Sequence, residues 1–381
     1  MAFLSNLLRR AAAVSAIAVC GAAVAADGVT DHSVKLGMSS PLSGPNGAYG
    51  RAMKEGIEAC FAQVNARGGI DGRRLELVAL DDGYETTAAV ANARHLIDSE
   101  KVFALMGFYG TSPTTAVLPE LEKSGVPLIG TVSGAEVLRG PTHRTMFHLR
   151  ASYGDETAAI VKTLLTVGVQ RIAVFYQDDG FGQAGLKGIE RALEDARLKP
   201  VAVASVPRNS IEVAAAAETI AKANPQAVVM ATLYRPTAEF IKQTRAAGAS
   251  PYFVALSPVG TDQLINELGA DKSRGIQVSQ VIPYPWGSKL QVVRDYKKAL
   301  PAYAKHDRYS YYSLEGYLNA RLVVAALERT GRQLGREQLM AALRSGPFDL
   351  GGFRVNYERN SNSGSSYVEI SVVGQGGQIL N

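Results

Sequence analysis

The sequence predicts an α/β protein of two lobes, each a doubly wound parallel sheet with helices on both faces. Three observations predict this fold class. Short apolar runs alternate with longer stretches of helical periodicity, the alternation occurs twice in the same order, and a pause over 135–156 separates the two series. Without its leader the chain keeps about 355 residues, enough for two domains of ordinary size.

The first series opens with a strand over 34–40, followed by an amphipathic helix over 47–67. The rest of this series alternates in the same way, as strand 75–82, helix 86–99, strand 102–107, helix 113–124 and strand 127–134. The second series repeats the pattern with strand 171–178, a helix to about 197, strand 201–206, helix 212–223, strand 227–232, helix 235–247 and strands 252–257 and 275–280.

The C-terminal part departs from this alternation. Three helical stretches cover 288–303, 313–330 and 336–345. The last segments, 353–358 and 367–374, flank an Asn/Ser/Gly-rich turn and predict a β-hairpin.

Residues 1–26 have the pattern of a cleavable signal peptide. Arg9 and Arg10 precede an apolar core that is too short for a permanent membrane anchor, and small residues follow it. A lipid anchor on Cys20 is disfavoured because Val19 stands where such signals need a small residue. We therefore expect an exported protein.

Charge and cysteine content exclude several classes of protein. The formal net charge is +5, and removing the two leader arginines leaves +3, with no basic run that indicates nucleic acid. Only Cys60 then remains, on the apolar stripe of a helix, so we expect a buried thiol and no internal disulfide.

Catalytic and metal-binding patterns are missing. The histidines show no zinc spacing; they are His32, His95, His143, His148 and His306. The segment around Ser133 has Ala135 where a nucleophile elbow needs glycine. Acidic pairs at 81–82 and 178–179 end two strands, and we expect one acid of each pair to cap a helix and the other to be exposed. We expect no metal, no cofactor and no enzyme activity.

A glycine motif raises the question of a dinucleotide site. Gly180, Gly182 and Gly185 have the spacing G-x-G-x-x-G after a predicted strand. The next strand, however, ends at 207–208 in Pro-Arg instead of the acid that would hold a ribose, and the acids at 178–179 would repel a pyrophosphate. The glycines instead predict a tight turn that brings a strand end and a helix start close to a cleft.

One long run carries a family resemblance. VKLGMSSPLSGPNGAYGRAMKEGIEACFAQVNARGGIDGRRLELVALDD resembles the opening of periplasmic solute-binding proteins of the leucine/isoleucine/valine-binding type, which serve ABC importers. PLIGTVSGAEVLR, MFHLRASYGDE, VFYQDDGFGQAG and YSLEGYLNAR continue the match in order. The resemblance implies the type I periplasmic binding protein fold, two lobes joined by three crossovers that close on a ligand like a Venus flytrap. Lobe one would take 27–148 and 281–350, and lobe two 149–280 and 351–381.

The resemblance also implies a ligand site between the lobes. Lobe one would hold a carboxylate through backbone N–H and hydroxyl groups at Thr111, Ser133 and Ala135. Aromatic residues would wall the site, and these are Tyr49, Tyr109, Tyr153, Phe181 and Tyr234. The alternative for Thr111 and Ser133 is that they cap the helices that follow them.

At one position the sequence departs from the family. Ser257 stands where family members have the acid that holds a ligand's ammonium group. Burying an ammonium without a counter-charge is costly, so a carboxylate with an apolar or aromatic body becomes the rival of a standard amino acid, unless Asp178, Asp179 or Glu315 substitutes. Glu315 could instead pair with Arg150 near the hinge.

Together these features predict a periplasmic binding protein that captures a small amino acid or carboxylate, aromatic ones included. Its partners would be that small molecule and the ABC permease subunits in the inner membrane, without nucleic acid, and we expect a monomer. The alternative is a periplasmic sensor of the same fold that presents its solute to a receptor.

Overall fold

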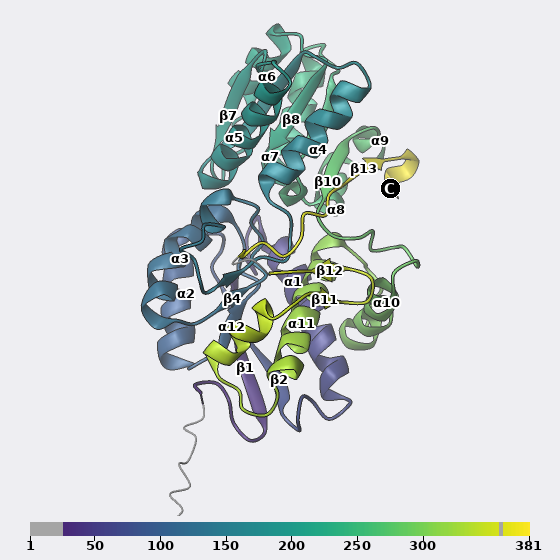
Figure 1. The fold of residues 1–381 in the computed structure, drawn as a ribbon. Helices are drawn as coiled ribbons and strands as arrows, with labels where there is room; N and C mark the ends of the chain where they lie inside the picture. The colour runs from purple at the N-terminus through teal and green to yellow at the C-terminus, as the bar shows by residue number, and fades with distance from the viewer. Residues whose placement is uncertain (1–25, 358–360) are drawn as a thin grey trace, which may run out of the picture.

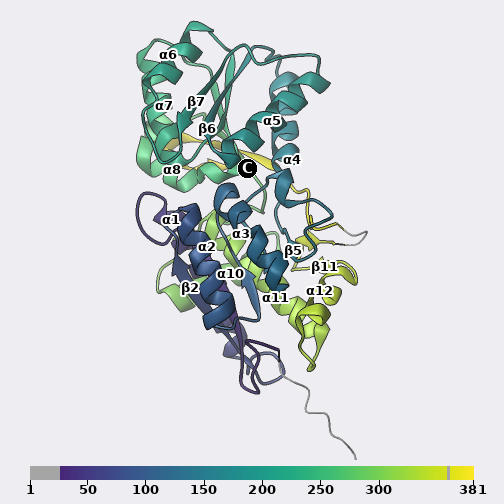
Figure 2. The same cartoon turned by 90° about the vertical axis from the view of Figure 1, so that its left-hand side faces the viewer.

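The computed structural model describes residues 26–357 and 361–381, which form two lobes (Figures 1 and 2). The first lobe is built on a parallel sheet with the strand order β2-β1-β3-β4-β5. Its strands are β1 (Ser33–Ser40), β2 (Arg74–Asp81), β3 (Ala104–Met106), β4 (Leu128–Ile129) and β5 (Met146–Phe147).

Helices cover both faces of this first sheet, because successive side chains of a strand point to opposite faces. Ala104 and Met106 of β3 join the core under one helical layer, and Leu105 joins the core under the other. The first layer contains α1 (Gly47–Asn65), α10 (Gln291–Ala304), α11 (Tyr311–Thr330) and α12 (Arg336–Arg344); the second contains α2 (Thr86–Arg94) and α3 (Thr111–Ser124).

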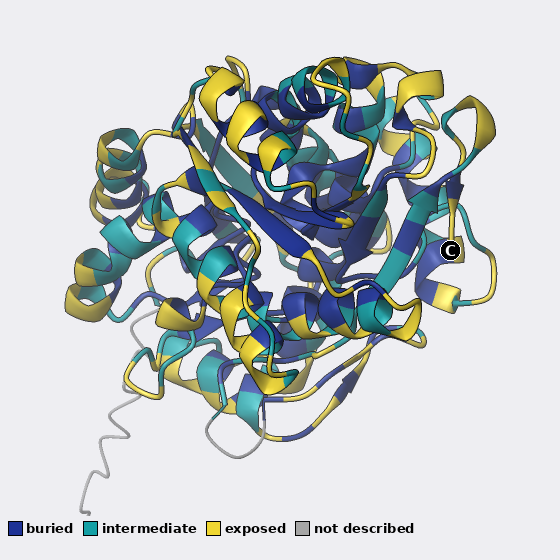
Figure 3. Cartoon of the chain, turned by 90° about the horizontal axis from the view of Figure 1, so that it is seen from above, coloured by how far each residue is buried: buried dark blue, intermediate teal, exposed yellow. Residues whose placement is uncertain are grey.

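The second lobe has a mixed sheet with the order β14-β13-β10-β9-β8-β6-β7, in which β6 to β10 are parallel and β13 runs antiparallel to both of its neighbours, β10 and β14. Its strands are β6 (Ile172–Asp178), β7 (Val203–Pro207), β8 (Ala227–Ala231), β9 (Tyr252–Ala255), β10 (Gln277–Gln280), β13 (Glu369–Val373) and β14 (Ile379–Leu380). The helices of one face are α4 (Tyr153–Thr166) and α5 (Gly180–Asp195); those of the other are α6 (Ala214–Lys222), α7 (Tyr234–Ala246) and α8 (Thr261–Leu268), followed by the short α9 (Ala270–Ser273). Figure 3 shows the buried strands enclosed by helices whose outer faces are exposed.

The expected C-terminal hairpin is wrong. Arg354–Val355 (β12) pairs with Phe348–Asp349 (β11), and β13 instead pairs with β10 and β14. The reason is local: the Asp349 carboxylate accepts hydrogen bonds from the N–H groups of Gly351 and Gly352, which close a tight turn directly after β11. Strands β13 and β14 therefore form the edge of the second sheet.

The predicted fold class is confirmed by these two sheets, between which the chain passes three times, after β5, β10 and β12. The predicted lobe boundaries stay predictions, and the expected signal peptide lies outside the described residues except for Ala26. Cys60 is buried, as expected. Within the described part of the chain, every helix is too short or too polar to cross a membrane.

Candidate functional site

The candidate site lies where the two lobes face each other. In open α/β sheets the loops at the carboxyl ends of the strands form the ligand site, and here such loops from both lobes meet. The N–H of Gly180 donates to Ser112 Oγ at 3.1 Å, and Asn209 Nδ2 donates to Glu85 Oε1 at 2.7 Å. A cavity of about 210 Å³ opens between the lobes, lined from one side by the loops at 45–46 and 83–85 and from the other by residues of lobe two, including Gln177.

Four tyrosines, here called the tyrosine cluster, fill the centre of this interface: Tyr49, Tyr84, Tyr109 and Tyr312. The rings of Tyr49 and Tyr109 stack at 4.9 Å, and Tyr84 and Tyr312 lie edge-on or tilted against them. Burial raises the pKa of Tyr49, Tyr84 and Tyr109 well above the usual value, so these phenols remain protonated donors. The hydroxyl of Tyr312 donates to the carbonyl of Pro258 in lobe two at 3.1 Å.

Tyr49 connects the lobes most directly. Its hydroxyl donates to the backbone oxygen of Val259 at 2.8 Å and accepts from the N–H of Tyr234 at 3.2 Å. Tyr234 in turn donates its hydroxyl to the carbonyl of Pro45 in lobe one. Two of the predicted aromatic wall residues therefore hydrogen-bond across the interface in both directions.

The predicted carboxylate-binding residues lie together, fully buried, on lobe one. Thr111 Oγ1 and Ser133 Oγ are 2.7 Å apart, and the N–H of Ala135 donates to Ser133 Oγ at 3.2 Å. Thr111 does not act as a helix cap, because α3 begins after Gly110 and has no side-chain cap. Burial raises the pKa of the neighbouring Tyr153 to about 12 despite the opposing effects of Arg150 and the Thr111 hydroxyl.

Phe181 and the glycine motif bring lobe two close to these hydroxyls. The Phe181 ring is 5.3 Å from that of Tyr153. Gly182 permits the close approach, because a Cβ there would lie 1.8 Å from the backbone oxygen of Gln177. The motif thus packs helix α5 onto strand β6 and places Gly180 against lobe one.

The acids at 178–179 divide as expected. Asp179 caps α5 by accepting from the N–H groups of Phe181 and Gly182, and its other oxygen accepts from Gln177 Nε2 at 2.8 Å. Asp178 is exposed and accepts from Gln183.

For the acids at 81–82, the expected exposed residue is found but the expected helix cap is not. Asp81 is exposed, but Asp82 caps no helix. Asp82 is buried and accepts from Ser39 Oγ at 2.8 Å and from the N–H of Tyr84, and burial raises its pKa to about 6. Asp81 accepts from the N–H of Leu42 at 2.8 Å, so this pair ties the loop after β2 to β1 and to the loop that follows it.

Ser257 is held by an acid that the sequence did not single out. Glu156 is completely buried at the start of α4, where it accepts from the N–H and the hydroxyl of Ser257 at 2.8 and 3.0 Å and from Ser279 Oγ at 2.6 Å. Burial raises the pKa of Glu156, against the lowering effect of Arg150 and the donors. The Glu156 carboxylate is therefore already hydrogen-bonded to two serines of lobe two.

Glu315 pairs with Arg150, the alternative that the sequence left open. Arg150 Nε and Nη2 donate to the two carboxylate oxygens at 2.9 and 3.1 Å, and both side chains are almost fully buried. This bidentate pair joins α11 of lobe one to the first crossover. Across residues 26–357 and 361–381, no cluster of His, Cys, Asp or Glu has the size and arrangement to hold a metal ion.

Arg208 is a site residue that sequence reasoning missed. Its guanidinium lies 4.6 Å above the Tyr84 ring, with Asp179 and Glu85 each 3.6 Å away. Its Nε and Nη2 atoms are buried without a hydrogen-bond acceptor among the described residues. A signal existed, because Arg208 stands two residues after the predicted strand 201–206, and loops at strand ends line such clefts.

Comparison with known proteins agrees with this architecture. Residues 33–378 match the family model described as periplasmic binding protein. An amino acid binding protein of Pseudomonas aeruginosa is 26% identical over 314 residues, which cover 80% of this chain and 81% of that protein. The crystal structure of a possible leucine/isoleucine/valine-binding protein from Rhodopirellula baltica is 32% identical, covers 92% of this chain and 97% of its own, and has a TM-score of 0.86. A substrate-binding periplasmic protein from Ralstonia solanacearum is 33% identical, with a TM-score of 0.85 and coverage of 91% and 99%. The chain belongs to the periplasmic binding protein family.

Proposed function

We propose that this protein is the periplasmic substrate-binding protein of an ABC importer, which captures a small amino acid or carboxylate between its lobes and delivers it to the permease. Within that range we favour a carboxylate that lacks an α-ammonium group and carries an apolar or aromatic body. The family relationship supports the transport role, and the chemistry of the interface supports the choice of ligand.

The observation that carries the choice is an imbalance of hydrogen-bonding groups between the lobes. On the donor side, the buried Nε and Nη2 atoms of Arg208 have no acceptor among the described residues, whereas the Thr111 and Ser133 hydroxyls are paired with each other at 2.7 Å. On the acceptor side, Glu156 and Asp179 are already used by donors of lobe two. An anion gains a partner at Arg208 and replaces only the one hydrogen bond between the Thr111 and Ser133 hydroxyls, whereas an ammonium group has to displace several donors from Glu156 or Asp179.

A thermal-shift screen with matched ligand pairs tests this choice. 4-Methylpentanoate and leucine, or 3-phenylpropionate and phenylalanine, differ only in the α-ammonium group. A ligand at a hundred times its Kd stabilises the folded protein by about 2.7 kcal/mol, which is readily seen as a rise in Tm. We expect the carboxylate of a pair to give the larger shift, and stabilisation by leucine, isoleucine or valine alone would refute the preference.

Variants then test the assigned donors. The double variant Thr111→Ala/Ser133→Ala removes both hydroxyls together, so neither loses its partner alone. Arg208→Gln removes the guanidinium, and Arg191→Gln on the exposed face of α5 is its matched control. Hydrogen bonds to charged groups contribute about 1.5–3 kcal/mol, so each site variant should raise Kd at least tenfold. Unchanged affinity in the double variant would return both hydroxyls to a structural role.

A further inference from the structure

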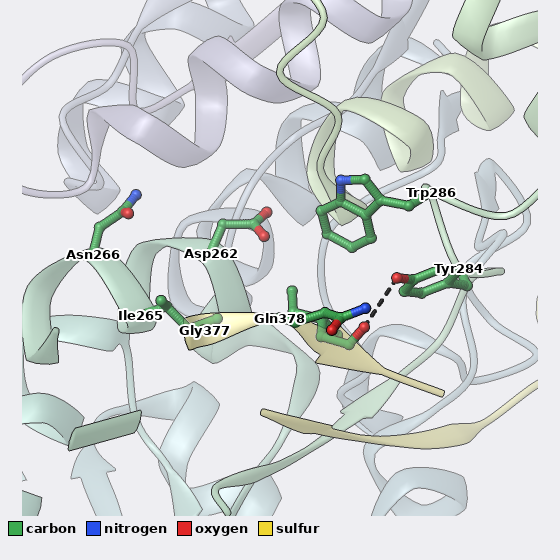
Figure 4. Close-up of a pocket in the computed structure, with 8 residues that line it drawn as sticks. Asp262, Ile265, Asn266, Tyr284, Trp286, Gly377 and Gln378 are labelled. Carbon is green, nitrogen blue, oxygen red and sulfur yellow. Dashed lines mark hydrogen bonds between the residues drawn. The ribbon is translucent and has the colours of Figure 1, made fainter. Parts of the chain in front are cut away.

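A second cavity shares no lining residue with the cavity between the lobes. Its volume is about 470 Å³, within the range of small-molecule sites. Three parts of the chain line it: α8 with Asp262, Ile265 and Asn266, the segment 377–379 that leads into β14, and the second crossover with Tyr284 and Trp286. Figure 4 shows the Asp262 carboxylate and the Trp286 indole projecting into the same space.

The aromatic side of this cavity is held in place. The Trp286 ring lies 5.1 Å from that of Tyr284 and 5.7 Å from that of Tyr311, which it meets edge to face. The Tyr284 hydroxyl donates to the carbonyl of Ile379 at 2.9 Å, as the dashed line in Figure 4 marks. The rings are thus oriented by contacts that need no ligand.

On the opposite side of the cavity, the Asp262 carboxylate lacks a counter-charge. Asp262 makes no hydrogen bond or ion pair with any described residue, and burial raises its pKa to about 7. The phenols of Tyr296 and Tyr311 face it, and their raised pKa values keep them neutral. The Arg150 guanidinium lines a small pocket together with Asp262, but it is paired with Glu315. The nearby Lys297 donates to the carbonyl of Trp286, and no basic residue lines the cavity.

We infer that this cavity is a binding site for a small organic ammonium ion, with Asp262 as its counter-charge and Trp286 and Tyr284 as its aromatic wall. A cation over an indole face is attracted by the ring quadrupole, and the attraction grows where water is excluded. The amides of Asn266 and Gln378 offer oxygens to N–H groups of a primary or secondary amine. This inference does not depend on the proposed function.

Intrinsic fluorescence provides the test, because Trp286 is the only tryptophan of the chain. Choline is titrated at constant ionic strength against 3,3-dimethylbutan-1-ol, its neutral carbon isostere. We expect a saturable change of emission with choline, and binding of the isostere at least tenfold weaker. Equal responses to both compounds, or no saturable response to choline, would overturn the inference.

Two variants locate the site. Asp262→Asn keeps the size of the side chain and should abolish the choline response, whereas Asp271→Asn, at an exposed position on α9, should leave it unchanged. Thermal unfolding of each variant verifies that it is folded. The Thr111→Ala/Ser133→Ala variant should respond to choline like the wild type, which separates this site from the one between the lobes. A wild-type response in Asp262→Asn, or a lost one in the double variant, would contradict the assignment.

Discussion

Replacing Tyr49 by phenylalanine removes one oxygen atom from the contact between the lobes. That hydroxyl satisfies the carbonyl of Val259 at 2.8 Å and the N–H of Tyr234 at 3.2 Å, both in lobe two. When the lobes separate, these backbone groups reach water and lose nothing by the substitution. Tyr49→Phe should therefore leave each lobe folded and destabilise only the joined state, in which the two lobes are in contact.

The size of the effect follows from the two hydrogen bonds. A neutral hydrogen bond contributes about 1 kcal/mol net, so losing both disfavours the joined state by about 2 kcal/mol. This corresponds to roughly a 30-fold change in the equilibrium between separated and joined lobes. Because a binding site that needs both lobes is completed only in the joined state, the apparent Kd should rise by up to the same factor.

Two measurements check this reasoning. Calorimetric titration with the best ligand of the thermal-shift screen gives Kd, and small-angle scattering gives the radius of gyration of the ligand-free protein. The control is Tyr317→Phe, because the Tyr317 hydroxyl donates to Gln63 within lobe one at 2.8 Å. If Tyr49→Phe leaves both the Kd and the radius of gyration at the values of the control, the hydroxyl does not hold the lobes together.

Three further predictions concern buried charges and the single thiol. Glu315→Gln should lower the free energy of unfolding by about 3–5 kcal/mol in urea titrations, because it leaves the buried Arg150 without its counter-charge; a loss below 1 kcal/mol would show that water reaches the pair. Burial raises the pKa of Asp262 to about 7, above its unfolded value, so its contribution to stability is complete at low pH and is lost as pH rises through 7. Asp262→Asn should thus raise Tm relative to wild type at pH 8 by more than at pH 5, and a pH-independent difference would contradict the burial. Burial also raises the pKa of Cys60 to about 12, so in the chain without residues 1–26 a thiol reagent should label it only in denaturant; rapid labelling of the native protein would contradict the packing of α1.

Most of the order of elements could be predicted because its signal is local, although β5 and α4 were missed. Apolar runs such as Ala227–Ala231 are buried on both faces in a parallel sheet, so they are hydrophobic without interruption. The C-terminal pairing could not be predicted in the same way. The β-propensity of 369–373 does not say which strand will be its neighbour, and the two turns at 351–352 and 360–366 offer equally good hairpins in the sequence.

The candidate site was predictable where backbone position decides the placement. Thr111 and Ser133 follow neighbouring strands, so their meeting follows from the parallel sheet. Tyr84, Arg208 and Glu156 were missed because their roles depend on contacts between segments far apart in the sequence. The ring of Tyr84 meets Arg208 only once the lobes face each other. Glu156 stands at the end of the pause over 135–156, where no element was predicted, so its three donors could not be anticipated.

Glu156 also shows why an acid near the ligand site need not serve the ligand. Ser257 covers this carboxylate with two hydrogen bonds and Ser279 adds a third, so an incoming ammonium group would have to replace three satisfied donors with its own. Each donor left unpaired in a buried place costs about 1–3 kcal/mol, which exceeds the gain from one new hydrogen bond. A serine at 257 therefore does more than omit the family's acid. It places neutral hydrogen-bond donors on a buried carboxylate of lobe two, and this supports the proposal that a ligand binds to the hydroxyls of lobe one and to Arg208 instead.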